Sequence, residues 1–443
     1  MHRFVKWALG KSRKNAGIKL FYVYFEQKNI AVINETVRPL LINAQKPSPH
    51  ANCLFYGENT LESVHLSIKN EALEVPCFKD KLHAREAWWE MIRAVRVPSG
   101  FCNSGLYLTG YTLEKKQWVL SSWIWTSAAV ARYLYSTGEI KSLELLADTF
   151  LQHQLDFGGW RVRFDIARDG VLPNAAPNDS AYIARNALLN AYKIFGRKNY
   201  LDAAIRCAQW IMNTAREDGL VHIGLDLRSH SWIKNVNIVD IGFTMDFFAQ
   251  LYSITGNEAF STFLVRFLKS YIRYFYNEQK CLFSTSIDEN NKQIGGFFAR
   301  GQGWALEGLI SSWKIIKSSQ LGEIIDQLCS RLVALQLPNG GWPYNFSKPY
   351  LGEDCKGVAV LAYHLMEWYG ITGKQLLLSS AKAAIAWCET HTQMEGPCRG
   401  GIFSFSAEGA IAHSFYSSTA FTYATCYALE TIKKIEEADD LYQ

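Results

Sequence analysis

The feature that most constrains this fold is a repeat with a period of about 55–60 residues. Its marker is an aromatic residue that ends an apolar, helix-like run just before a turn. The marker occurs at Tyr135, Tyr192, Tyr252, Trp313 and Tyr369. A fixed period of this kind indicates an array of one supersecondary unit. Residues at the same phase of each unit are then expected to meet on one face of the array.

The repeating unit has the pattern of a helical hairpin. One run extends from Leu188 to Tyr192 and a second from Tyr200 to Met212, with Gly196 between them. The second run places apolar residues on one helix face at three- and four-residue spacing, and a glycine between two runs is typical of a helix end. Five to six such pairs predict an all-α, (α/α)6 toroid, in which loops that enter the inner helices form the rim of a cleft.

An open α-solenoid has a similar period, but two Gly-Gly-Trp turns favour the closed toroid. They lie at 158–160 and 340–342, where glycine lets the chain turn tightly beside a large ring. We assign the toroid to residues 106–443. Residues 1–105 do not fit the repeat and form an N-terminal extension of mixed structure, in which the segment from His83 to Val95 has helical spacing.

Composition excludes several classes of protein. The chain has 443 residues, 49% of them hydrophobic and a net charge of +5, so it is expected to be globular and not to bind nucleic acid. No His, Cys or acid spacing typical of a metal site occurs, and no phosphate-binding or dinucleotide-binding loop. We therefore expect no metal and no cofactor. The ten cysteines include no Cys-x-x-Cys pair, which is typical of a reducing compartment and predicts a cytoplasmic protein.

The start of the chain is basic and lacks the features of a signal peptide. A solvated tail is one interpretation. A peripheral contact with an anionic membrane surface is the other, because apolar side chains lie between the charges. Residues 1–20 contain no acidic residue. Their basic residues are Arg3, Lys6, Lys11, Arg13, Lys14 and Lys19.

Two acids, Asp179 and Asp240, occur at the same phase of successive repeats, each just before an apolar run. Either could be a helix N-cap. Their shared phase favours a common site, and the flanking Val239 and Ile241 give Asp240 an apolar setting that suits a general acid. Chemistry on sugars commonly needs two carboxyl groups across one bond.

Arg300 and Trp304 lie four residues apart, so on a helix they share one face. An arginine after two phenylalanines and an alanine is costly to bury alone. It is expected to bind a carboxylate, either a substrate's or an internal one from Asp179, Asp240 or Glu307. Gln302 adds an amide at the expected rim.

Aromatic residues near these positions are candidates for stacking on sugar rings. Core packing is the alternative for each of them. The candidates are Trp125, Trp160, Trp342 and Tyr344.

Taken together, these motifs resemble the unsaturated glucuronyl hydrolases and their unsaturated rhamnogalacturonyl relatives, of the six-hairpin glycosidase superfamily. The resemblance covers roughly residues 110–430 and is most specific in Ala299-Arg-Gly-Gln-Gly-Trp304. The other matching segments are Trp123-Ile-Trp125-Thr, Asn178-Asp179, Ile238-Val-Asp240, and Gly341-Trp-Pro-Tyr344 followed by Glu353-Asp354.

The resemblance implies a metal-free hydrolysis of 4,5-unsaturated uronic acids. In that family one Asp protonates the C4=C5 double bond and then activates the water that attacks C5. Asp240 corresponds to this acid and base, Asp179 to its partner, and Arg300, Trp304 and Trp125 to substrate contacts. Asn178 stands where the family often has His, and we include it among the substrate-binding candidates.

Two other interpretations stay open. One is a uronyl C5-epimerase or lyase on the same fold, with Tyr182, His413 and Tyr416 available as bases. The other is a saccharide-binding or scaffold protein of polysaccharide synthesis, in which neither Asp179 nor Asp240 is required for function. The expected partner in each case is an oligosaccharide or polysaccharide.

Overall fold

A computed structural model describes the chain over residues 84–97, 103–112, 117–119, 121–165, 174–233, 237–349, 352–403 and 419–440. The basic segment at residues 1–20 lies outside these ranges, so the suggested membrane contact stays a prediction. No helix in the described ranges is long and apolar enough to cross a membrane.

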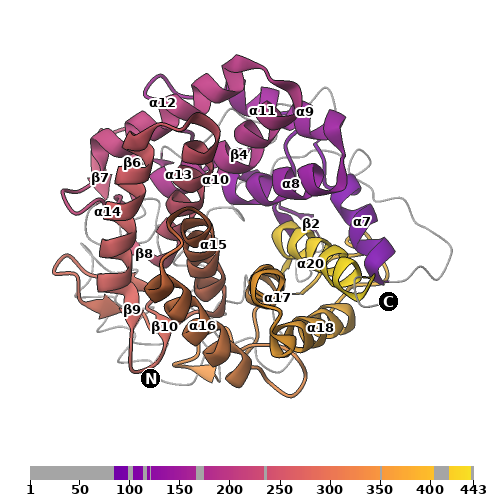
Figure 1. The fold of residues 1–443 in the computed structure, drawn as a ribbon. Coiled ribbons are helices and arrows are strands. Elements are labelled where there is room, and N and C mark those ends of the chain that lie inside the picture. Colours follow the sequence, from indigo (N-terminus) through magenta and orange to yellow (C-terminus); the bar gives the residue numbers. More distant parts are fainter. Residues whose placement is uncertain are drawn as a thin grey trace, which may run out of the picture.

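The inner helices form a closed ring (Figure 1). Each packs against the next, and the last, α20, packs against the first, α8. The predicted (α/α)6 toroid is confirmed. The inner helices are α8 (Ile124–Thr137), the continuous run of α10 (Pro177–Ile183), η3 (Ala184–Leu189) and α11 (Asn190–Phe195), then α13 (Gly242–Thr255), α15 (Ala299–Ile316), α17 (Cys355–Thr372) and α20 (Thr422–Asp440).

An outer helix accompanies each inner helix and buries one apolar face against it, as in α12, where Ala204, Ala208 and Ile211 are buried. The outer helices are α7 (Ala84–Ala94), α9 (Ile140–Gln152), α12 (Lys198–Thr214), α14 (Glu258–Phe275), α16 (Ser319–Ala334) and α18 (Gln375–Thr390).

The outer helix beside α20 comes from the N-terminal side of the chain. α7 packs against α20 and buries Trp88, Met91 and Ile92 in the same core as the other helices. This confirms the helix expected between His83 and Val95. It also means that α7 belongs structurally to the toroid, although we had placed it in the N-terminal extension.

The repeating turn of the sequence is the end of each inner helix. The glycines after α8, α11, α13 and α17 have φ angles of 75°, 65°, 65° and 68°, in the left-handed region. This conformation ends a helix at little cost when the residue is glycine. After α15 the same position is Lys317, with φ 54°, which explains why the turn was harder to recognise there.

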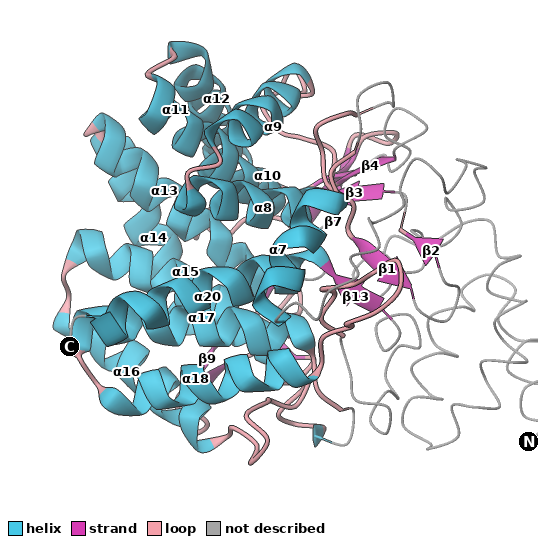
Figure 2. Ribbon diagram, turned by 90° about the vertical axis from the view of Figure 1, so that its right-hand side faces the viewer, coloured by secondary structure: helices cyan, strands magenta, loops and turns pink. Residues whose placement is uncertain are grey.

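Short strands gather at one end of the toroid (Figure 2). β3 (Ser121–Trp123) leads directly into α8 and β13 (Thr419–Phe421) into α20, while β8 (Asn237–Ile238) precedes the short helix η4 (Val239–Ile241) and α13. The N-termini of inner helices therefore meet at this end, which we call the strand end.

The strands pair in small antiparallel sheets that link neighbouring hairpins. β3 pairs with β4 (Arg163–Asp165), and β1 (Gly110–Thr112) pairs with both β13 and β2 (Gln117–Trp118). The other sheets join β5 (Asn174–Ala175), β6 (Gly224–Asp226) and β7 (Ser231–Ile233); β8, β11 (Ser286–Ile287) and β12 (Gln293–Ile294); and β9 (Tyr276–Asn277) with β10 (Leu282–Phe283).

Candidate functional site

The polar and aromatic residues singled out in the sequence mostly lie at the strand end. Trp125 is in the first turn of α8, Asp179 in that of α10, and Arg300 in that of α15, while Asp240 lies in η4 just before α13. Their common phase in the repeat thus corresponds to a common position in the ring.

Asp179 is buried, with 2% of its surface exposed. The helix cap is Ala176, so the N-cap alternative for Asp179 is wrong. The carboxyl group lies within the first turn of α10, where the helix dipole favours a negative charge. The Asn178 side-chain amide, also buried, lies 3.5 Å from the Asp179 carboxylate as a donor.

The backbone of Asp240 is held between the helices that carry Asp179 and Arg300. Both α10 and α15 pack against η4. The Val239 carbonyl oxygen accepts a hydrogen bond of 2.9 Å from the Tyr271 hydroxyl. The Val239 backbone N–H donates to the carbonyl oxygen of Thr285. The Asp240 side chain itself lies outside the part of the chain that the structure describes.

Arg300 forms an ion pair with Asp354, whose Oδ2 lies 3.0 Å from Arg300 Nη1. Its other Nη atom donates to the Tyr344 hydroxyl at 3.3 Å. Asp354 is thus an internal partner of Arg300 that the sequence analysis did not name. Asp354 caps α17, and its Oδ1 accepts from the Lys356 backbone N–H. One carboxylate thus fixes both the helix start and the guanidinium.

Trp304 and Trp125 are both partly exposed. The Arg300 guanidinium lies 5.6 Å from the Trp304 ring, as expected for one helix face. The Trp304 indole N–H donates to the Tyr423 hydroxyl at 3.0 Å, and Tyr423 meets the Trp125 ring edge-on at 5.7 Å. Both indoles contact Tyr423 and stay partly exposed to solvent, as a ring that stacks on a sugar must be.

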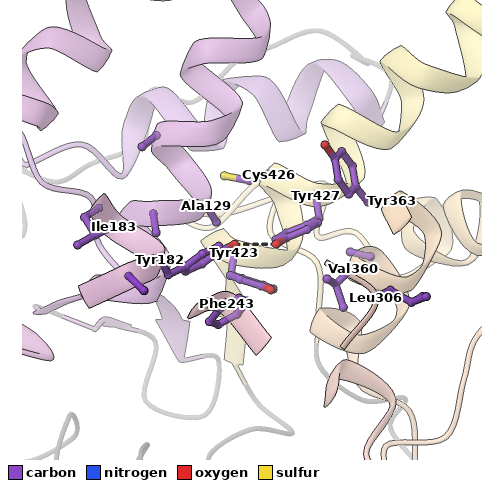
Figure 3. Packing of buried hydrophobic residues seen from close by; sticks show 14 of the residues in the cluster. Ala129, Tyr182, Ile183, Phe243, Leu306, Val360, Tyr363, Tyr423, Cys426 and Tyr427 are labelled. Carbon is purple, nitrogen blue, oxygen red and sulfur yellow. Dashed lines mark hydrogen bonds between the residues drawn. The ribbon is translucent and has the colours of Figure 1, made fainter. Parts of the chain in front are cut away.

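Below these rings the ring axis is filled with aromatic side chains. Tyr182 of α10 stacks on Phe243 of α13 at 3.9 Å, and its hydroxyl is 2.6 Å from that of Tyr427. Figure 3 shows these side chains beside Tyr423. All of them are almost fully buried, so the inner helices pack against one another through these aromatic rings.

Lys356 lies beside these candidate residues, and sequence reasoning missed it. It lies in the first turn of α17 and is 6% exposed. Its Nζ is 4.1 Å from the Phe421 ring and 5.2 Å from the Trp125 ring. Burial, together with the nearby Arg300, lowers the pKa of Lys356 to about 7. A usable signal was a lysine in the first turn of an otherwise apolar helix, where the dipole disfavours a cation.

Two predicted stacking residues, Trp160 and Trp342, are instead core residues, both 0% exposed. Their indole N–H groups donate to the carbonyl oxygens of Phe150 at 2.7 Å and Leu332 at 2.8 Å, near the ends of α9 and α16. The Gly-Gly-Trp turns therefore anchor outer helices. A Cβ at Gly340 would lie 2.2 Å from the Ala383 carbonyl oxygen, which explains the glycine.

Gln302 does not lie at a rim, as we had expected, but is fully buried. Its amide pairs with both the N–H and the carbonyl oxygen of Phe283, at 2.7 Å and 2.8 Å, and so holds β10 on α15. Tyr344 is 3% exposed and contributes through its hydrogen bond to Arg300. Within the described ranges, no group of three His, Cys or acidic residues is arranged to hold a metal ion.

The fold and the strand-end site together define the class: a six-hairpin toroid of the kind found in carbohydrate-active enzymes. The profile of Glycosyl Hydrolase Family 88 matches residues 121–430, and the chain belongs to this family. No curated protein matches the sequence significantly.

Solved structures with the same fold include hydrolases and an epimerase. An unsaturated glucuronyl hydrolase specific for heparin has a TM-score of 0.62 at 14% identity, covering 81% of this chain and 98% of its own. The unsaturated glucuronyl hydrolase of Bacillus sp. GL1 has a TM-score of 0.56 at 15% identity, covering 71% and 86%. A sugar epimerase from a ruminal bacterium has a TM-score of 0.64 at 13% identity, covering 79% and 98%.

Proposed function

We propose that this protein is a glycoside hydrolase that acts on saccharides ending in a uronic acid, with a 4,5-unsaturated uronate as the preferred residue. One observation carries the proposal. Asp179 and the backbone of Asp240 lie on adjoining inner elements, and η4 also packs against α15, which bears Arg300 and Trp304. Two acids, a cation and two partly exposed indoles at one end of the ring suit an acidic sugar.

In the proposed reaction Asp240 transfers its proton to C4 of the double bond, and positive charge develops at C5. Asp240 then removes a proton from a water molecule as the oxygen bonds to C5. The product is a hemiketal, which opens and releases the linked sugar. Asp179, in the first turn of α10, is the partner carboxylate, and Asn178 donates toward it.

The test is the ultraviolet absorbance of the C4=C5 chromophore during incubation with unsaturated uronyl disaccharides from several lyase digests. We expect the absorbance to fall, and Asp240→Asn to slow the fall by about 10²- to 10⁴-fold while the fold is kept. Asp439→Asn is the matched control, because Asp439 pairs with Lys382 on the exposed surface. Full activity in Asp240→Asn would contradict the assignment.

A uronyl C5-epimerase or lyase is the second candidate, supported by the likeness to a sugar epimerase. Of its three proposed bases, Tyr182 is fully buried, and burial raises its pKa well above the ordinary value. His413 and Tyr416 lie outside the described residues. A rise in absorbance on saturated polysaccharide would identify a lyase, and exchange of the C5 proton without bond cleavage an epimerase.

We also propose a cytoplasmic location, from the scattered cysteines. Those in the described part of the chain form no disulfide with one another. Cell fractionation of the tagged full chain tests this, and also tests the suggested membrane contact of residues 1–20. The scaffold interpretation requires that Asp179→Asn and Asp240→Asn both leave the cellular function intact.

A further inference from the structure

We propose that Tyr423 is a positioning residue that holds the two partly exposed indoles of the candidate site, Trp125 and Trp304, in one fixed arrangement for sugar binding. The inference rests on the proposed function, because both indoles are candidates for contact with the sugar. It goes beyond that proposal by naming a buried residue that acts on the sugar only through these two rings.

Tyr423 joins three inner helices at the strand end. It lies in the first turn of α20, directly after β13, and only 2% of its surface is exposed. Trp125 lies in the first turn of α8 and Trp304 in the second turn of α15. One side chain of α20 therefore contacts an indole from each of the other two helices.

The contact with Trp304 is a hydrogen bond of defined direction. An indole N–H can only donate, so the Tyr423 hydroxyl oxygen accepts, at 3.0 Å. On the inner side of the ring, Phe243 meets the Trp304 indole edge-on at 5.8 Å. A hydrogen bond at the nitrogen and a packing contact on the ring together restrict the rotation of the indole.

The contact with Trp125 uses the ring of Tyr423 and not its hydroxyl. The two rings are 5.7 Å apart and meet edge-on at an angle of 74°, which is one of the preferred arrangements of an aromatic pair. Phe421 lies 6.3 Å from the same indole. The hydroxyl and the ring of Tyr423 thus serve different indoles, so substitutions can remove one contact at a time.

Tyr423 can hold these indoles because the aromatic side chains behind it are themselves fixed. Its ring lies 4.7 Å from that of Tyr427, and Figure 3 shows both. The Tyr427 hydroxyl is 2.6 Å from that of Tyr182 and donates to Glu307 at 3.2 Å. Close packing leaves such buried rings little room to move. The indoles are therefore ordered before a sugar arrives, and less conformational freedom is lost on binding.

The experiment is isothermal titration calorimetry of the full chain with a saturated glucuronate disaccharide. Tyr423→Phe removes the hydroxyl and keeps the ring, and we expect about 3- to 10-fold weaker binding, the usual effect of one hydrogen bond. In a Trp304→Phe background the same substitution should change the affinity by less than about twofold, because no indole N–H remains to be held. An equal effect in both backgrounds overturns the action through Trp304.

Tyr423→Leu tests the contact with Trp125. It removes the ring as well as the hydroxyl, so it should weaken binding by a further factor of about 3 relative to Tyr423→Phe. This further loss should fall below about twofold in a Trp125→Ala background. Circular dichroism establishes that each variant is folded. A leucine variant that binds as tightly as the phenylalanine variant overturns the action on Trp125.

The control for a purely structural effect is Tyr200→Phe. Tyr200 is fully buried, and its hydroxyl donates to Asp148 at 2.6 Å between the outer helices α12 and α9. Loss of this hydroxyl should lower stability and leave the sugar affinity at the wild-type value. A loss of affinity equal to that in Tyr423→Phe would assign both effects to stability and overturn the inference.

Nuclear magnetic resonance of protein with isotope-labelled indole nitrogens gives a readout without sugar. The Trp304 signal is the one that disappears in Trp304→Phe. Loss of its hydrogen bond in Tyr423→Phe should shift this signal and speed the exchange of the N–H proton with water, whereas Tyr200→Phe should leave both unchanged. An unchanged Trp304 signal in Tyr423→Phe overturns the inference.

The outcomes separate this inference from the proposed function. In an active hydrolase, Tyr423→Phe should raise KM by the factor by which it weakens binding and leave kcat nearly unchanged, because it acts on binding alone. Unchanged affinity and KM in that variant overturn the role of Tyr423 only. The expected losses of affinity in a protein that leaves unsaturated disaccharides intact support the inference and overturn the hydrolase reaction. A wild type that binds neither disaccharide overturns both.

Discussion

The inner helices carry a strand-end set and an axial network of charged residues, most of them buried, in which burial affects the pKa values differently. The strand-end set is Arg300, Asp354 and Lys356. The axial network lies further along the same helices, and its members contact one another across the ring. It consists of Arg132, Glu307, His364, Glu367 and Glu430.

In the axial network the protein itself provides the counter-charges. Arg132 lies 2.9 Å from Glu430 and 3.7 Å from Glu307. Burial acts most strongly against its charge, but Glu430 and the neighbouring tyrosines together outweigh burial, and the pKa of Arg132 is raised well above its ordinary value. In the strand-end set burial prevails, and the pKa of Lys356 falls to about 7. The comparison shows that burial outweighs the favourable neighbouring charges at Lys356 but not at Arg132.

The largest effect should come from breaking the axial network. Arg132→Met leaves Glu307 and Glu430 buried without their cation, which should lower the free energy of unfolding by about 3–5 kcal/mol. Urea denaturation followed by circular dichroism measures this change, with Lys382→Met as a surface control. A loss below about 1 kcal/mol would show that Arg132 does not stabilise Glu307 and Glu430 as strongly as the short distances between them indicate.

Removing the strand-end cation should have the opposite sign. Lys356 has a lower pKa in the folded chain than in the unfolded chain, so its burial costs stability fully below about pH 7, and the cost is relieved as the pH rises toward the ordinary value of 10.5. Lys356→Met should therefore be more stable than the wild type by about 1–3 kcal/mol at pH 6.

The gain in Lys356→Met should shrink between pH 7 and pH 10, which the same denaturation series at several pH values would show. A destabilised Lys356→Met at pH 6 would show that burial of this ammonium does not cost stability and would remove the contrast between the two sets.

His364 tests the pH dependence of the axial network. Burial disfavours its cation, but the nearby Glu307 carboxylate and the hydrogen bond with Glu367 together outweigh burial and raise its pKa above 6.5. The stability that it contributes is full below the unfolded-state pKa and is lost as the pH rises through the folded-state pKa. Relative to His364→Gln, the wild type should lose roughly 1–2 kcal/mol on this rise. A flat difference between the two proteins would contradict the assignment.

The smallest effects should separate core indoles from site indoles. Trp160→Phe loses the hydrogen bond to Phe150 and should cost about 1–2 kcal/mol of stability without altering sugar binding. Trp125→Phe should change stability less and weaken sugar binding more. Thermal unfolding and calorimetric titration of both variants measure the two quantities. Equal effects of both variants on binding would contradict the division.

Much of the fold was predictable because it depends on local rules repeated along the chain. The turn after a marker aromatic ends an inner helix at a glycine of positive φ, as at Gly196 and Gly256, so the same local pattern recurs along the chain. The shared phase of Asp179, Asp240 and Arg300 likewise predicted that they lie at one end of the ring. The outer helix α7 was harder to assign, because its partner α20 follows about 300 residues later and no local pattern records that contact.

Which side chains are exposed at the candidate site depends on the tertiary structure. Trp160 and Trp125 were both candidates for stacking, yet Trp160 is fully buried against the end of α9 while Trp125 is partly exposed beside Tyr423. Asp354 pairs with Arg300 because α17 lies beside α15. Burial and the nearby Arg300 of α15 lower the pKa of Lys356. The sequence by itself determined the period, the hairpins and the end of the ring where polar residues meet, since these follow from local conformation. Only the tertiary structure decided burial, charge pairing and protonation, because these depend on helices that are distant along the chain.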